Sequence, residues 1–118
     1  MTVDMLSFGK IVLDGKTYDH DLVIDRGEIG KRKKGESKPL KGRYGHTPLT
    51  PRENIPWDCR RLVIGTGMSE ALPVTDELRE EADRLGVELQ LMPTPDAAAL
   101  LEQTGTGGGT NFVLHLTC

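Results

Sequence analysis

Arg61-Leu62-Val63-Ile64-Gly65-Thr66-Gly67-Met68-Ser69-Glu70-Ala71-Leu72 is the stretch on which the fold of this chain depends. Its first part is an apolar run of Leu and β-branched residues, which predicts a central strand from Leu62 to Gly65. The strand runs into a Gly-x-Gly turn, and a polar segment then leads toward a helix. Strand, glycine turn and helix in this order form many ligand crevices of α/β proteins. The stretch therefore predicts a fold class and a candidate site.

The chain after this stretch alternates helices and strands. Thr75, followed by two acids, is a predicted N-cap, and Gly86 is the matching stop signal. Thr94-Pro95-Asp96 repeats the pattern of an N-cap, a proline and an early acid. The expected elements are a helix over 76–85, a strand over 87–92, a helix over 97–103 and a strand over 111–116. The helix over 76–85 joins the strand over 62–65 to the strand over 87–92, so these two strands are expected to lie parallel.

The first third of the chain predicts a small antiparallel meander. Asp14-Gly15 is a type I′ hairpin signal, because both central positions of that turn need positive φ. The expected strands cover residues 8–13, 17–25 and 28–32, with a second turn at Arg26-Gly27. Residues 35–48 show no apolar period and are expected to form a loop. Thr50-Pro51-Arg52-Glu53 has the spacing of a capping box, which predicts a helix of one or two turns.

These elements predict one domain, residues 1–118, with an α/β fold, a mixed sheet and helices on its faces. No apolar run approaches the ~20 residues that span a bilayer. The N-terminus lacks the basic and apolar regions of a signal peptide, so we expect no membrane association and a cytoplasmic protein. Cys59 and Cys118 lie far apart in sequence and are expected to be free thiols in that compartment.

A basic segment interrupts a chain whose net charge is −3. Residues 31–43 hold seven bases and one acid, a net charge of +6 that leaves −9 for the rest. Such a cluster attracts phosphate or an acidic partner, although it is also what a solvated loop looks like. Nucleic acid is not expected, because no aromatic residues are interleaved to stack bases. The candidate contact residues are Arg32, Lys33, Lys34 and Arg43.

The glycine turn is the candidate ligand site. The carboxyl ends of parallel strands meet at one sheet edge, so this turn and Thr94 are expected to line one crevice. Backbone N–H groups there favour an anion. The candidate ligand-binding residues are Gly65, Thr66, Gly67, Met68, Ser69 and Thr94. A dinucleotide fingerprint is incomplete, because Glu70 stands at its third glycine position, and a purely structural turn is the alternative.

Two further kinds of chemistry have some support in the sequence. Ser69, Asp96 and His115 occur in the Ser…Asp…His order of a nucleophile elbow, although Ala71 replaces its last glycine and the chain is short. His115 and Cys118 are metal-ligand types, but their odd spacing on a strand points them to opposite faces. We therefore expect no metal and no cofactor, and retain the Ser69 arrangement only as an alternative.

The run from Leu62 to Leu72, together with the ending His115-Leu116-Thr117-Cys118, resembles the adipogenesis-associated domain-containing protein family. The distant relatives of that family include a mitochondrial respiratory complex I assembly factor. The likeness extends over nearly the whole chain. The resemblance implies a three-layer α/β fold, with a mixed central sheet of about five strands and an added N-terminal antiparallel β-layer. It implies no reaction, but assembly or regulation through protein partners.

The expected function is that of a non-enzymatic protein-binding or assembly and regulatory module, with an anion-binding crevice at the glycine turn. The alternative is a small enzyme, either a hydrolase that uses Ser69 or a converter of an anionic metabolite. The partner expected is a protein, and self-association through the basic segment and an acidic helix stays open.

Overall fold

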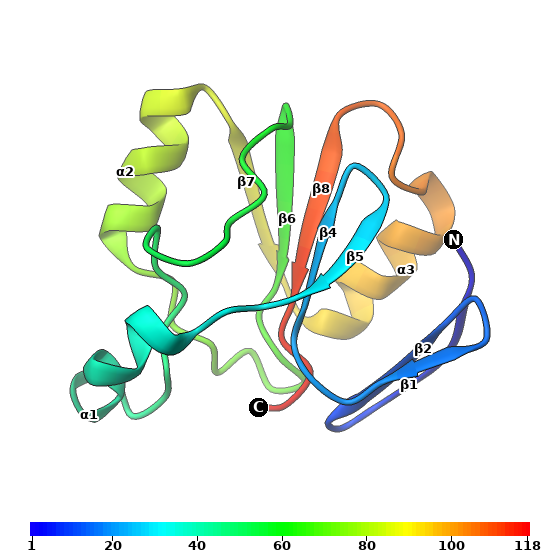
Figure 1. Cartoon of the computed structure of the whole chain (residues 1–118), viewed down its shortest axis with the longest axis horizontal. Helices are drawn as coiled ribbons and strands as arrows, with labels where there is room; N and C mark the ends of the chain where they lie inside the picture. The colour runs from blue at the N-terminus through cyan, green and yellow to red at the C-terminus, as the bar shows by residue number, and fades with distance from the viewer.

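The computed structural model describes all 118 residues, which form two sheets, three α-helices and one 3₁₀-helix (Figure 1). The first sheet has the order β1 (Val3–Ser7), β2 (Lys10–Leu13) and β3 (Lys16–Tyr18). The second has the order β5 (Glu28–Lys31), β4 (Leu22–Asp25), β8 (Thr110–Leu114), β6 (Arg61–Gly65) and β7 (Glu88–Met92). The helices are η1 (Gly35–Leu40), α1 (Lys41–Tyr44), α2 (Asp76–Leu85) and α3 (Thr94–Thr104).

The five-stranded sheet is mixed, as the sequence predicts. Strand β6 lies between β7 and β8 and is parallel to both. On the far side of β8, strand β4 runs antiparallel, and β5 forms the edge. The apolar run of residues 62–65 is therefore the central part of a sheet that is covered on both faces.

Two cores lie on opposite faces of this sheet because alternate side chains of a strand point to opposite faces. Val63 packs toward α3 and the three-stranded sheet, together with Phe112 of β8. Leu62 and Ile64 pack on the other face, against α2. Figure 1 shows α2 on one side of the sheet, with α3 and the small sheet on the other. This is the three-layer arrangement with an added β-layer that the resemblance implies.

The turn and cap signals of the sequence are confirmed at several positions. Asp14 and Gly15 have φ of 48° and 80°, as a type I′ turn requires. Helix α2 covers the predicted residues, and the side chain of Thr75 accepts a hydrogen bond from the N–H of Leu78 at 3.3 Å. Gly86 ends the helix with φ of 71°.

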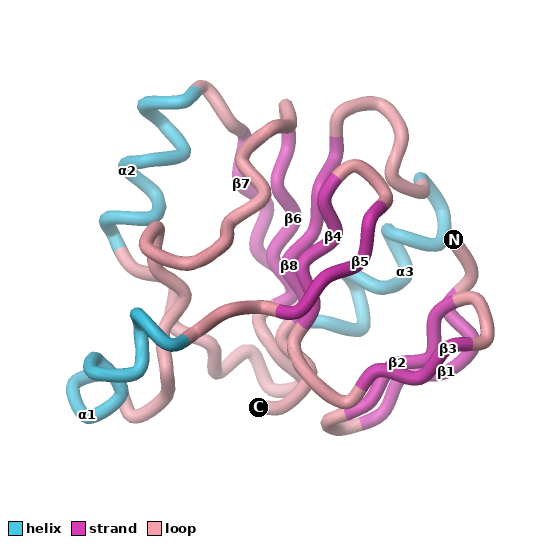
Figure 2. Tube along the Cα trace, viewed as in Figure 1, coloured by secondary structure: helices cyan, strands magenta, loops and turns pink.

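The predicted strand boundaries of the first third are wrong in two places. Phe8-Gly9 forms a turn between β1 and β2, so the expected strand over 8–13 begins only at Lys10. The expected strand over 17–25 is two strands, β3 and β4, which belong to different sheets (Figure 2). The chain leaves one sheet between them at Asp21, whose carboxylate accepts a hydrogen bond from the N–H of Leu116 at 2.9 Å.

Two predictions in the middle of the chain are also wrong. The expected loop over 35–48 contains η1 and α1. The expected helix after Thr50 is only a turn, although its capping contacts form: Thr50 N–H donates to Glu53 Oε2 and Arg52 N–H donates to Thr50 Oγ1, both at 3.3 Å. The Glu53 carboxylate also binds a buried arginine, and Pro56 follows too closely for a helix to continue.

Helix α3 begins at Thr94, three residues before the predicted start, and β8 ends at Leu114 instead of 116. Trp57 is half-buried against the core on the α2 face. Cys59 and Cys118 are free thiols. None of the helices has the length and apolar character needed to cross a membrane.

Candidate functional site

The glycine turn after β6 is occupied by the chain's own last residues. Met68 N–H donates to the carbonyl of Thr117 at 2.7 Å. Ser69 N–H and Ala71 N–H both donate to the main-chain oxygen of Cys118, at 2.9 and 3.0 Å. The backbone donors that the sequence assigns to an anion therefore hold residues 117 and 118 in this structure.

Gly67 is the residue that permits this close contact. Its φ is 110°, and a Cβ built on it would lie 2.3 Å from the main-chain carbon of Cys118. Gly65 has a related role, since its Cβ would lie 2.9 Å from Thr94 Oγ1. Both glycines thus admit other parts of the same chain, which is the structural alternative for a Gly-x-Gly turn.

Thr94 joins this turn to the end of β8. Its hydroxyl donates to the carbonyl of His115 at 2.5 Å and accepts the N–H of Gly67 at 2.9 Å. Thr94 is therefore the first residue of α3 and not its N-cap, because its hydroxyl is already engaged. The structure does place Gly65, Gly67 and Thr94 together, as the parallel strands predict, and Thr66 joins them through hydrogen bonds to Met92.

The predicted nucleophile arrangement does not form. Ser69 and Asp96 are exposed, and neither makes a hydrogen bond to His115. The ring of His115 instead binds Asp21, with Nδ1 and Oδ2 2.7 Å apart. Sequence order suggested Asp96, but α3 directs that residue to solvent, and the chain reversal before β4 brings Asp21 to the histidine.

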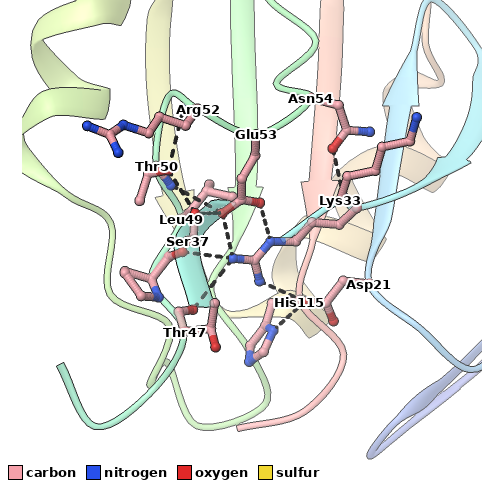
Figure 3. Close-up of polar contacts among 12 residues, drawn as sticks. Asp21, Lys33, Ser37, Thr47, Leu49, Thr50, Arg52, Glu53, Asn54 and His115 are labelled. Carbon is pink, nitrogen blue, oxygen red and sulfur yellow. Dashed lines mark hydrogen bonds and ion pairs between the residues drawn. The ribbon is translucent and has the colours of Figure 1, made fainter. Parts of the chain in front are cut away.

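Arg32 lies at the centre of a buried polar cluster. Figure 3 shows Asp21, Ser37, Glu53 and His115, which belong to this cluster. Only 3% of the residue is exposed. Its Nε and Nη2 donate to the two carboxylate oxygens of Glu53 at 2.6 and 3.0 Å. Nη1 donates to Asp21 Oδ2 at 3.0 Å, and Nη2 also donates to the carbonyl of Pro48 at 2.9 Å. The prediction that Arg32 belongs to an exposed contact surface is therefore wrong.

Two hydroxyl groups complete what we call the Arg32 cluster: Asp21, Arg32, Ser37, Thr50, Glu53 and His115. Ser37 Oγ donates to Glu53 Oε2 at 2.6 Å and lies 2.7 Å from Thr50 Oγ1. The Thr-x-x-Glu spacing was the only sequence signal for these contacts. Nothing in the sequence pairs Glu53 or Asp21 with one arginine among seven bases.

Asp21 is ionised because of this cluster. Burial by itself would raise the pKa of its carboxyl group. The hydrogen bond and charge of His115, the N–H of Leu116 and the hydrogen bond from Arg32 outweigh burial and lower the pKa from 3.8 to about 2. Asp21 is thus a buried carboxylate that holds one face of the His115 ring.

This shift predicts an acid-dependent loss of stability. The folded pKa of Asp21 lies below its ordinary value of 3.8, so the unfolded chain binds the proton more readily. Ionised Asp21 therefore contributes about 2 kcal/mol to the free energy of unfolding above pH 4, and this contribution is lost as the pH falls toward 2. Denaturant unfolding at a series of pH values measures it.

Two variants make that experiment specific. Asp21→Asn is expected to remove this part of the pH dependence, whereas Asp96→Asn, which changes an exposed carboxylate, keeps it. If Asp21→Asn retained the parental slope between pH 4 and 2, the assignment of the shift to Asp21 would be wrong.

The remaining bases of the segment are exposed. Lys33, Lys34 and Arg43, predicted as contact residues, have no ion-pair partner, and the same holds for Lys38, Lys41 and Arg52. Arg43 and Arg52 line a groove of about 250 Å³ with Tyr44, over whose ring the Arg43 guanidinium lies at 5.5 Å.

The fold and this site define a class of three-layer α/β domain. Its glycine turn forms hydrogen bonds to residues 117 and 118 of the same chain, and a buried arginine begins its basic segment. Residues 3–104 match the model of a family described as protein of unknown function (DUF498/DUF598), so the chain belongs to that family. The chain has no match among the curated proteins.

Solved structures agree with this assignment. A conserved hypothetical protein from Pyrococcus horikoshii OT3 is 30% identical over the full length of both chains, with a TM-score of 0.84. A protein named MT938 has 18% identity and a TM-score of 0.70 over 98% of this chain and 97% of its own. A Bordetella pertussis protein described as a Mth938-like domain has 18% identity and a TM-score of 0.63 over 98% of this chain and 85% of its own. The last two support the fold alone.

Proposed function

We propose that this protein is a binding module that recognises an acidic segment of a partner protein through its basic segment. The observation that carries the proposal is that six exposed cations from residues 33–52 have no ion-pair partner within the chain. Unpaired surface charge of one sign steers oppositely charged partners to a surface and fixes their register.

The Arg32 cluster supports this proposal because it fixes the basic segment to the sheet. Arg32 ties the end of β5 to Glu53, and Ser37 ties the start of η1 to the same carboxylate. A surface that is already ordered loses less conformational entropy when it binds. The buried arginine thus supplies the scaffold, while the exposed bases supply the contact.

An acidic polypeptide fits this surface better than a nucleic acid. Glu77 of α2 lies in the same groove as Arg43 and Arg52. The negative charge of Glu77 would repel a phosphate backbone that followed this groove. The residues outside the basic segment carry a net negative charge, which opposes the approach of a long polyanion. Side-chain carboxylates of a protein can instead pair singly with the two guanidinium groups.

The resemblance to the adipogenesis-associated domain family, and more distantly to a complex I assembly factor, supports the same kind of role. We therefore propose assembly or regulation through a protein partner, in the cytoplasm, as the biological setting. Pairing with the acidic α2 of a second copy is the competing use of the surface, and the oligomeric state distinguishes the two.

The test is charge reversal on the basic segment. Lys38→Glu/Lys41→Glu is expected to weaken binding to a short peptide with a few glutamates about tenfold and to lower the salt dependence of that binding, because two exposed cations are lost. Titration by fluorescence anisotropy at several salt concentrations gives both values, and light scattering gives the oligomeric state.

The matched control is Lys10→Glu/Lys16→Glu, which makes the same change of charge on the three-stranded sheet. Equal weakening by both double variants would show that net charge alone attracts the peptide and would overturn the proposal. Dissociation of a dimer by the first variant would assign the surface to a second copy instead.

A further inference from the structure

His115 connects a buried carboxylate to a hydroxyl group. On one side its Nδ1 lies 2.7 Å from Asp21 Oδ2, and on the other its Nε2 lies 3.3 Å from Thr117 Oγ1. The histidine is 8% exposed, whereas Thr117 is half-buried. This is the order of groups, acid then imidazole then hydroxyl, that activates a nucleophile in acyl-transfer enzymes.

The two contacts of the His115 ring suit one tautomer of the imidazole. A carboxylate can only accept a hydrogen bond, so Nδ1–H of this tautomer donates to Asp21 Oδ2. Its Nε2 can then accept the O–H of Thr117. Arg32 and the N–H of Leu116 also donate to Asp21, which holds the carboxylate and therefore the ring in place.

Thr117 lines a cavity of about 260 Å³. Three bases, Lys31, Arg32 and Lys34, and two acids, Asp19 and Asp21, also line it. Lys31 and Lys34 have no ion-pair partner. This volume lies just below the usual range for ligand sites, so it suits a small acyl compound. The three bases outnumber the two acids in the wall, which favours a negatively charged compound.

We propose that Thr117 is an acyl-accepting nucleophile, with His115 as its base and Asp21 as the positioning residue, for small esters that carry a negative charge. Thr117 Oγ attacks the ester carbonyl while His115 Nε2 takes the hydroxyl proton. The tetrahedral intermediate expels the alcohol oxygen, which receives that proton from His115. The product is a Thr117 ester, which water hydrolyses to the acid and free Thr117 with His115 again as base.

Main-chain donors are available near the reacting atom. The N–H groups of Thr117 and Cys118 donate to no acceptor within the protein, unlike those of the neighbouring glycine turn. Unused N–H groups beside a nucleophile are what stabilises the oxyanion of a tetrahedral intermediate. This inference does not depend on the proposed protein-binding role, since Lys38 and Lys41 lie outside the cavity.

The experiment uses two acetate esters, neutral p-nitrophenyl acetate and the anionic 4-acetoxy-3-nitrobenzoate. Release of the nitrophenolate is followed by absorbance, and peptide mass spectrometry locates any acetyl group. We expect Thr117→Val to lower the rate at least tenfold, Thr117→Ser to restore it, and the anionic ester to react faster. Ser69→Ala, which removes the hydroxyl first suggested by the sequence, is expected to leave the rate unchanged.

The outcomes separate a nucleophile from a reactive surface. An acetyl group on Thr117, or turnover that Thr117→Val abolishes, supports the proposal. Acetyl groups only on Lys31 or Lys34, with an unchanged rate in Thr117→Val, would overturn it. Thermal unfolding of Thr117→Val shows whether the variant folds. Where it does not, the parent protein decides the test, because acetyl groups on the lysines with none on Thr117 overturn the proposal.

Discussion

Replacement of Arg32 by Met is expected to lower the free energy of unfolding by about 3 to 5 kcal/mol, the usual effect of removing one partner from a buried ion pair. The guanidinium is the shared donor for Glu53 and Asp21, and its side chain is 1% exposed. Without it, the Glu53 carboxylate is left charged in a site with no exposed surface. The total free energy of unfolding of a small domain is only about 5 to 15 kcal/mol.

Guanidinium chloride unfolding measures this loss as a lower midpoint with an unchanged slope. The matched control is Arg26→Met, because Arg26 also pairs with two carboxylates, Asp25 and Asp58, but its side chain is 68% exposed. Exposed pairs contribute little to stability because water screens them, so the control is expected to stay close to the parent protein.

A second variant identifies the cause of the loss. Glu53→Gln in the Arg32→Met background removes the unpaired charge and is expected to recover part of the stability, whereas it destabilises the parent. If the two substitutions were additive, or if Arg32→Met and Arg26→Met behaved alike, the Arg32 cluster would not be the main polar support of this segment.

Replacement of Gly67 by Ala is the second large effect. The new Cβ would lie 2.3 and 2.4 Å from the main-chain carbon and oxygen of Cys118, too close for either to remain. The last residues must move away and give up the hydrogen bonds from Met68, Ser69 and Ala71. Each lost hydrogen bond costs about 1 kcal/mol, and alanine at a positive φ adds backbone strain. The free energy of unfolding is therefore expected to fall by about 3 to 4 kcal/mol.

Hydrogen exchange gives the specific readout, because the amides of Ser69 and Ala71 lose their acceptor and are expected to exchange faster. Gly108→Ala is the control: its φ is 70°, but a Cβ there meets no atom within 4 Å. It is expected to cost about 1 kcal/mol, from backbone strain alone. Equal costs for the two variants would show that the contact with Cys118 contributes nothing.

The covered central sheet could be predicted because local patterns and topology rules act there together. The apolar run before Gly65 is short and rich in β-branched residues, which favours a buried strand, and the helix that follows makes the next strand parallel. Thr75 and Gly86 set the ends of α2 through local backbone geometry, so the sequence was sufficient. The Asp14-Gly15 turn was predictable for the same reason.

Contacts between distant residues were decided only by the tertiary structure. Seven bases look alike in sequence, yet Arg32 is buried because β5 ends beside Glu53 and Asp21. His115 was recognised as a chemical group, but its partner is Asp21 and not Asp96, since β4 and β8 are neighbours.

The glycine turn shows the same contrast between what the sequence predicts and what the tertiary structure decides. By itself, the sequence determined that a Gly-x-Gly turn follows the central strand and that Thr94 lies next to it. Only the tertiary structure decided that the turn receives residues 117 and 118 of its own chain. A glycine pattern specifies where a backbone can approach closely, whereas the path of the whole chain specifies which group approaches.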